Sequence, residues 1–159
     1  MSIVQRAVRP LQLVLVLTFA LLVLLQTMSF PGQFAHMAKE HPDMAYLRWP
    51  LTAFAVVEIL CVQVVIVCTW TLLSMVQQER IFTEDALRRV DVMIGAIWTG
   101  WLILAGTSLY LALIADDPGG PILLLLMVLG GGAFGLLMLV MRELLRQATS
   151  LRTDMEAVI

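Results

Sequence analysis

The sequence is poor in charged residues, which make up only 14% of its 159 positions, whereas 60% are hydrophobic. Soluble domains carry about a quarter charged residues, so this composition excludes an ordinary soluble globular protein. The formal net charge is −2, too small to indicate an acidic substrate or a nucleic acid as the ligand. We therefore expect no direct nucleic-acid binding.

Cysteine and histidine are scarce, with two of each in the chain. Cys61 and Cys68 are too far apart along one helix to form a disulfide, and no Cys-x-x-Cys motif accompanies them. They are expected to be small buried side chains. Neither histidine lies in a long apolar run, which excludes a haem held by two histidines between membrane helices. We expect no cofactor.

The histidines do belong to a group of soft ligands of the kind that suits copper. The spacing His-x4-His is not a defined metal site, however, and methionine is common throughout this chain, which has ten. We therefore expect no metal and keep four weak candidates: His36, Met37, His41 and Met44.

Catalytic motifs are missing as well. The sequence contains no visible Ser-His-Asp set, no phosphate-binding loop and no His-Glu-x-x-His zinc motif. We therefore expect that the protein is not an enzyme.

The chain is rich instead in long apolar runs. A membrane-spanning helix needs about 20 mostly apolar residues, and four runs reach that length. Together they predict one all-α membrane domain over residues 1–159, an antiparallel bundle of four transmembrane helices arranged as two hairpins. The first run is too long for the apolar region of a signal peptide, so we expect it to be retained. The expected spans are 11–30, 51–75, 92–115 and 121–141.

Proline and glycine mark where these helices should end. Pro31 and Gly32 are expected to stop the first helix, and an outer loop should then run to Pro50. Pro50 suits the first turn of the second helix. The segment "ADDPGGP" around Asp116 and Asp117 predicts a tight turn between the last two helices.

Basic residues predict the orientation, because lysine and arginine concentrate on the cytoplasmic side of a membrane. Eight of the ten basic residues fall on one side and two, Lys39 and Arg48, on the other. Both termini, the elbow (77–91) and the tail (142–159) should therefore be cytoplasmic. The eight are Arg6, Arg9, Arg80, Arg88, Arg89, Arg142, Arg146 and Arg152.

The elbow and the tail both contain helix signals. Thr83 is a good N-cap, and Glu84 after it suits the positive end of a helix dipole, so the third helix should begin there. Each segment also has an apolar stripe at helical spacing, which usually marks a packing surface. The stripes are Leu87, Val90, Ile94 and Ile97 in the first, and Leu144, Ala148, Leu151, Met155 and Val158 in the second.

Glu58 is an acidic residue inside an apolar run, about 12 Å below the start of its helix. A charge at that depth is costly, so its side chain should face other helices. A proton or ion site is one reading, and a hydrogen-bond network that sets helix register is the favoured one. At similar depths lie Gln26, Thr107 and Ser108, and Gln63 lies about one and a half turns deeper.

Gly131 and Gly135 form a GxxxG pair in the last apolar run, and Ala96 and Gly100 form a small-xxx-small pair in the run before it. Such pairs let helices approach closely. Packing of these two helices on each other explains both pairs, and homodimerisation is the rival explanation.

The two polar segments resemble a family of small bacterial four-helix membrane proteins that is catalogued as a domain of unknown function. The elbow matches the family's motif aromatic-Thr-x-(Glu/Asp)-x-x-Arg-Arg, and the tail matches Leu-Arg-x-(Asp/Glu)-hydrophobic-(Asp/Glu). The family's usual Pro-Phe-Thr reads Ile81-Phe82-Thr83 here. The matching residues are Phe82, Thr83, Asp85, Arg88 and Arg89, then Leu151, Arg152, Asp154, Met155 and Glu156.

The resemblance implies a bacterial inner-membrane protein whose gene often lies beside that of a Cro/C1-type DNA-binding regulator, and hence a cytoplasmic regulator as partner. We expect a regulatory or interaction role through the elbow and tail, whose arginines meet that partner or anionic lipid headgroups. The alternative is a small transporter or ion-conducting oligomer that uses Glu58. The arginines are Arg80, Arg88, Arg89, Arg146 and Arg152.

Overall fold

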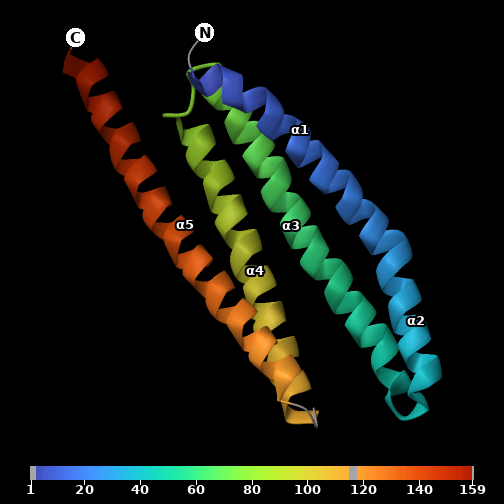
Figure 1. Ribbon diagram of the computed structural model, residues 1–159. Coiled ribbons are helices and arrows are strands. Elements are labelled where there is room, and N and C mark those ends of the chain that lie inside the picture. The colour runs from blue at the N-terminus through green and yellow to red at the C-terminus, as the bar shows by residue number, and fades with distance from the viewer. Residues whose placement is uncertain (1–2, 115–117, 159) are drawn as a thin grey trace. The chain divides into compact units, whose positions relative to one another are not determined.

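The fold consists of helices alone within the part of the chain that the computed structural model describes, residues 3–114 and 118–158 (Figure 1). This confirms the predicted all-α class. In order, the elements are α1 (Ile3–Leu24), the π-helix η1 (Leu25–Ser29), α2 (Phe30–Glu40), the 3-10 helix η2 (Pro42–Leu47), α3 (Arg48–Gln77), α4 (Glu84–Ile114) and α5 (Gly119–Val158).

Four helical stretches among these residues are long and apolar enough to cross a membrane, which indicates a multi-pass membrane protein. They are Val8–Glu40, Pro42–Gln77, Glu84–Ile114 and Gly119–Val158.

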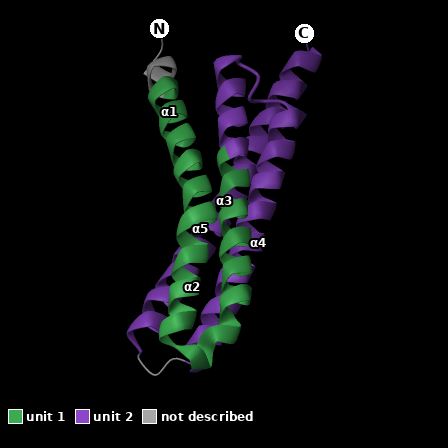
Figure 2. Cartoon of the chain, turned by 90° about the vertical axis from the view of Figure 1, so that its right-hand side faces the viewer, with its two compact units in different colours: residues 1–66 green, residues 67–159 purple. Residues whose placement is uncertain are grey.

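The chain divides into two compact units, residues 1–66 and 67–159, with the boundary inside α3 (Figure 2). The first unit joins α1 and α2 through η2 to the beginning of α3. The second contains the end of α3 together with α4 and α5. A single membrane domain over residues 1–159 stays a prediction.

The first helix does not end at Pro31 and Gly32, as the sequence predicted. It passes through η1, where the Phe30 amide donates to the Leu25 carbonyl five residues back. Such a π-turn accommodates a residue that cannot make the ordinary helical bond, and Pro31 follows in the first turn of α2, where a missing N–H costs little. The predicted outer loop is therefore mostly α2 and η2, and Pro50 lies in the first turn of α3.

The end of α3 is closed by a Schellman motif. The Arg80 amide donates to the Met75 carbonyl at 2.9 Å, and the Glu79 amide donates to the Val76 carbonyl at 3.1 Å. Between them Glu79 adopts a φ of 56°, the left-handed conformation that this motif requires and that glycine usually supplies. The elbow is thus a defined turn, and α4 begins at Glu84 as predicted.

In the second unit α4 and α5 lie side by side and run antiparallel, since Asp91 meets Arg142 while Trp101 meets Val128. Leu87, Val90 and Ile94 are buried, as their predicted stripe required. The turn predicted to connect the two helices falls on Asp116 and Asp117, which lie outside the described residues.

Glycines let two tryptophans of α4 approach α5. A Cβ atom at Gly131 would lie 3.1 Å from Cδ1 of Trp101, and one at Gly135 would lie 3.5 Å from the Trp98 ring. The Trp101 indole N–H donates to the Val128 carbonyl at 2.8 Å. Gly131 and Gly135 therefore serve the contact between α4 and α5, the first of the two explanations weighed for them.

Candidate functional site

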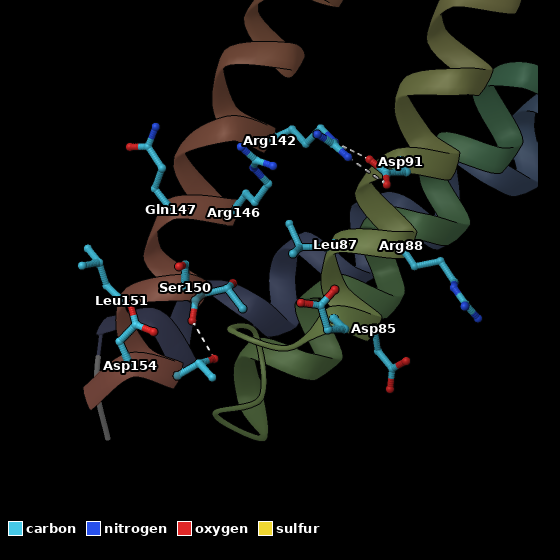
Figure 3. A pocket seen from close by; sticks show the side chains of 13 residues that line it. Asp85, Leu87, Arg88, Asp91, Arg142, Arg146, Gln147, Ser150, Leu151 and Asp154 are labelled. Carbon is cyan, nitrogen blue, oxygen red and sulfur yellow. Dashed lines mark hydrogen bonds and ion pairs between the residues drawn. The ribbon is translucent and has the colours of Figure 1, made fainter. Parts of the chain in front are cut away.

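The candidate site lies in the second unit, where the first turns of α4 and the polar end of α5 pass each other (Figure 3). A groove of about 1080 Å³ separates them there. Leu87 points from α4 towards α5, and Gln147 lies on the far side of α5 (Figure 3). Elbow and tail, more than fifty residues apart in sequence, thus line one space.

An ion pair between Asp91 and Arg142 closes the groove at its membrane end. Two of the three guanidinium nitrogens take part: Nε donates to Oδ1 of Asp91, and Nη2 donates to Oδ2 at 3.2 Å. The hydrogen bond from Arg142 lowers the pKa of the Asp91 carboxyl below its ordinary value. Each residue flanks an apolar stretch (92–115 and 121–141), so the pair links the two helices where the polar segments begin.

The groove is lined by charges of both signs. The carboxylates come mainly from α4, and the guanidinium groups come from both helices. Only Leu87 and Leu151 are apolar among the described residues that line it. Such a surface fits a partner that itself carries both charges, whereas a small apolar ligand would find little to contact. The charged residues are Glu84, Asp85, Asp91 and Asp154, with Arg88, Arg142 and Arg146.

The five arginines predicted for this region fall into two groups. Arg146 pairs with Glu143 at 3.1 Å, and Arg152 pairs with Glu156 at 3.1 Å, each along α5. The contact with Arg146 lowers the pKa of Glu143 below its usual range. Arg80, Arg88 and Arg89 make no ion pair with any described residue. Arg88 extends away from α5 (Figure 3), and the arginines without an ion pair all belong to the elbow.

A second, smaller space of about 150 Å³ lies where the elbow turn meets the end of the tail. Arg80 and Phe82 line it from the elbow, and Arg152 and Glu156 line it from α5. The elbow therefore lies against the tail on the side away from the apolar stretches. The two motifs that carry the family resemblance meet at this place.

Thr83 directly precedes α4, and its carbonyl accepts a hydrogen bond from the Ala86 amide at 3.1 Å. Its hydroxyl was predicted to accept from an amide of the first turn. Instead the hydroxyl donates to the Arg80 carbonyl at 2.9 Å. The Schellman turn at Glu79 brings that carbonyl within reach, so the side chain of Thr83 stabilises the turn before the helix.

The residues of the predicted polar cluster are divided between the two units. In the first unit, Gln63 Nε2 donates to Gln26 Oε1 at 3.3 Å, which joins η1 to α3. Oε2 of Glu58 is buried without a hydrogen-bond partner in the described part of the chain. Thr107 and Ser108 belong to α4 in the second unit. Gln26 and Gln63 do meet, whereas the meeting of Glu58 with Ser108 stays a prediction.

The weak metal candidates lie on α2 and the segment after it. His36 Nε2 lies 3.1 Å from Oε1 of Glu40, one turn along α2. The amide of His41 donates to the Met37 carbonyl, and the amide of Met44 donates to the His41 carbonyl, so this segment is organised by backbone hydrogen bonds. Among the described residues no group of three or more His, Cys, Asp or Glu side chains is arranged to hold a metal ion.

Sequence reasoning missed the ion pair between Asp91 and Arg142, although a signal for it existed. Asp91 is the last residue before one predicted span, and Arg142 is the first after the next. Antiparallel neighbours place those two ends at the same depth. The glycine pair likewise gave no hint that Trp98 and Trp101 fill the space beside it.

Comparison with known proteins identifies a family that matches most of the chain. The family described as "Protein of unknown function (DUF2975)" matches residues 32–159, which include the elbow, the groove and the whole of α5. No curated protein and no solved structure matches the chain. The family match confirms the resemblance seen in the two polar segments, and the chain belongs to the DUF2975 family.

Proposed function

We propose that this protein is a non-enzymatic, multi-pass protein of the bacterial inner membrane that binds a cytoplasmic protein in the groove between α4 and α5. The convergence of elbow and tail carries the proposal. The two segments are far apart in sequence, yet they line one groove of about 1080 Å³ beyond the apolar stretches.

The distribution of basic residues supports a cytoplasmic location for this groove. Arg88, Arg142 and Arg146 all line it, and arginines collect on the cytoplasmic side of membrane proteins. Charges of both signs in an open groove steer and orient a protein partner, because each sign attracts its opposite and rejects its like. Arg80, Arg88 and Arg89 lack ion pairs with described residues, so these arginines of the elbow are free to meet acidic side chains.

A DNA-binding regulator is the partner that the family resemblance implies. Binding to it would hold such a regulator at the membrane or change its activity, with no chemical step in the membrane protein. The partner needs exposed side chains of both charges to match the four acids and three arginines of the groove.

Site-specific photocrosslinking in the native host tests this function. A photoreactive amino acid at Ser150, which lines the groove, should give an adduct with a cytoplasmic regulator that mass spectrometry identifies. The same amino acid at Leu126, an exposed position in the apolar stretch of α5, serves as the matched control. A protein adduct no stronger at Ser150 than at Leu126 would contradict the proposal.

The crosslinked protein then allows a quantitative test. Its affinity for the membrane protein in nanodiscs should fall at least about tenfold when Arg88 and Arg146 are both changed to Glu, because the groove then repels the acids it attracted. Lys39→Glu is the control, since it changes the charge on α2. An equal loss in both variants would mean that net charge, and not the groove, governs binding.

A second function has one observation in its favour, the buried Oε2 of Glu58 without a hydrogen-bond partner among the described residues. An intramembrane carboxyl of this kind can carry protons or bind ions. If the protein is a transporter, Glu58→Gln should abolish proton- or ion-coupled flux into liposomes, while Glu40→Gln on α2 leaves it intact. Flux that is absent from the wild type, or unchanged by Glu58→Gln, would eliminate this alternative.

A further inference from the structure

The predicted apolar stripe of the tail is exposed. We call Leu144, Ala148, Leu151, Met155 and Val158 the seam; its four large side chains are between 54% and 87% exposed. The sequence predicted a packing surface here, but α4 packs on a different face of α5, the face of Thr149 and Gly135, both of which are buried. Within the second unit, the seam is therefore an apolar surface that no other described helix covers.

The seam projects away from the membrane. α5 is one helix of 40 residues from Gly119 to Val158. Its apolar stretch ends at residue 141, so the tail continues the same axis for about 25 Å beyond it. An amphipathic helix that rests on a bilayer lies in the plane of the surface, and α5 would have to break near Arg142 to do so. Lipid therefore does not cover the seam, and a protein surface must.

The spacing of the seam identifies the kind of surface. Its residues alternate four and three apart, the a/d heptad pattern by which parallel helices interlock in coiled coils. The same frame continues back through Met141, Leu137 and Phe134, which are also exposed, so the pattern covers more than three heptads. A soluble partner could follow it only as far as the membrane. A membrane helix can follow it throughout.

We propose that the seam pairs with the seam of a second copy of this chain, forming a parallel coiled coil along α5. Two copies inserted with the same topology present their α5 helices parallel and at equal depth, which a two-fold axis along the membrane normal brings into register. Identical stripes on parallel helices of equal depth are what a symmetric coiled coil requires.

The flanking side chains permit this pairing. No charged residue occupies an a or d position of the seam. In a parallel pair, Gln147 of one copy faces Arg152 of the other across the flanking positions, where an amide can accept from the guanidinium group. Glu143 and Glu156 lie on outward positions and stay in their ion pairs with Arg146 and Arg152.

The pairing leaves the proposed partner site open. The groove lies between α4 and α5, whereas the seam is on the side of α5 away from Gly135 and Thr149, with Leu151 at the margin of both. The inference does not depend on the proposed function: a dimer forms whether or not the groove binds a regulator.

Cysteine crosslinking in native membranes tests the inference. In a background with Cys61→Ala and Cys68→Ala, single cysteines replace Leu144, Met155 or Thr153. Thr153 lies near Met155 but lines the groove, so it is the matched control. Oxidation should join two copies through Leu144→Cys and Met155→Cys at least about tenfold more than through Thr153→Cys, because only the seam brings the two Cα atoms within disulfide range.

Two results would overturn the inference. One is equal crosslinking of the Met155→Cys and Thr153→Cys variants. Labelling of both denatured variants with a maleimide serves as the control that each thiol is present and reactive. The other is a Met155→Cys thiol that is protected from the maleimide in membranes yet forms no dimer, which would mean that another surface covers the seam. Independently, Leu151→Glu with Met155→Glu should convert a dimer into a monomer by native mass spectrometry from nanodiscs, whereas Thr153→Glu should not.

Discussion

Within the second unit, α4 and α5 meet in two different ways along their length. In the apolar stretch, Trp98 and Trp101 lie against glycines of α5, and the Trp101 indole bonds to a backbone carbonyl. At the polar end, the ion pair between Asp91 and Arg142 holds the helices beside an open groove. In lipid, two apolar helix surfaces gain no hydrophobic free energy by associating. The contact between α4 and α5 in the apolar stretch therefore depends on close packing. In water, charged side chains tolerate a gap that solvent fills.

This contrast predicts that a larger side chain on α5 lowers the stability of the protein only where α4 and α5 are in close contact. Gly131→Leu should destabilise the protein by about 3 kcal/mol, because overpacking of a close contact forces the neighbouring groups apart. A Cβ atom at this position would already lie 3.1 Å from Cδ1 of Trp101, and the rest of the leucine would collide with the indole ring. Gly130→Leu is the control, since a Cβ atom there meets nothing within 4 Å. Thermal unfolding in detergent measures both, and similar losses in the two variants would remove the contrast.

The indole hydrogen bond should matter less than the packing around it. Trp101→Phe keeps an aromatic ring beside Gly131 and Gly132 but removes the donor to the Val128 carbonyl. We expect a loss of about 1 kcal/mol, since hydrogen bonds between membrane helices are modest. Chemical unfolding of this variant beside Trp70→Phe, which lies on α3, checks the value. A loss as large as that of Gly131→Leu would show that the hydrogen bond dominates.

A substitution at Glu79, in the turn that ends α3, should increase the stability of the protein, because its φ of 56° suits glycine. Glu79→Gly should stabilise the protein by up to about 1 kcal/mol, because it relieves the left-handed strain in the Schellman motif. Gln78→Gly, one residue earlier, should lower stability, since it only adds freedom to the unfolded chain. The melting temperature of Glu79→Gly should be higher than that of Gln78→Gly. A lower melting temperature for Glu79→Gly than for Gln78→Gly would contradict the prediction.

The smallest effect is expected from the ion pair, which solvent screens. The pKa of Asp91 is lowered in the folded protein, so its contribution is present above the carboxyl's ordinary pKa and disappears as the pH falls through the lowered value. Asp91→Asn should therefore reduce stability at neutral pH and flatten the acid limb of the stability curve. Its effect should also shrink at high salt. An unchanged acid limb would mean that the pair adds nothing measurable.

Much of the fold was readable from composition and pattern. Four apolar runs predicted the membrane helices, and Glu84 was correctly identified as the start of α4. The elbow and tail motifs led to the right family. The first helix was predicted too short, because Pro31 and Gly32 usually end a helix and the π-turn that carries the chain past them depends on how the backbone relaxes locally.

The site was only partly readable. The elbow and tail, both singled out from the sequence, line one groove, but all five arginines were treated alike. The structure separates them, since Arg146 and Arg152 pair along α5 with neighbours one turn away. Arg142 and Asp91 were passed over because each looks like an ordinary residue at the edge of a span. Their pairing depends on the relative rotation of two helices, which no local pattern encodes.

Composition was enough to establish that the chain belongs in a membrane, because the transfer of long apolar runs into lipid outweighs any other term. Residue spacing was enough to establish the helical periodicity of the elbow and tail. Three outcomes emerged only from the packed helices of the second unit: which faces of α4 and α5 meet, that Asp91 pairs with Arg142, and that no other helix of this unit covers the tail's apolar seam. They depend on contacts between residues distant in sequence, and such contacts arise only when whole helices pack in one register.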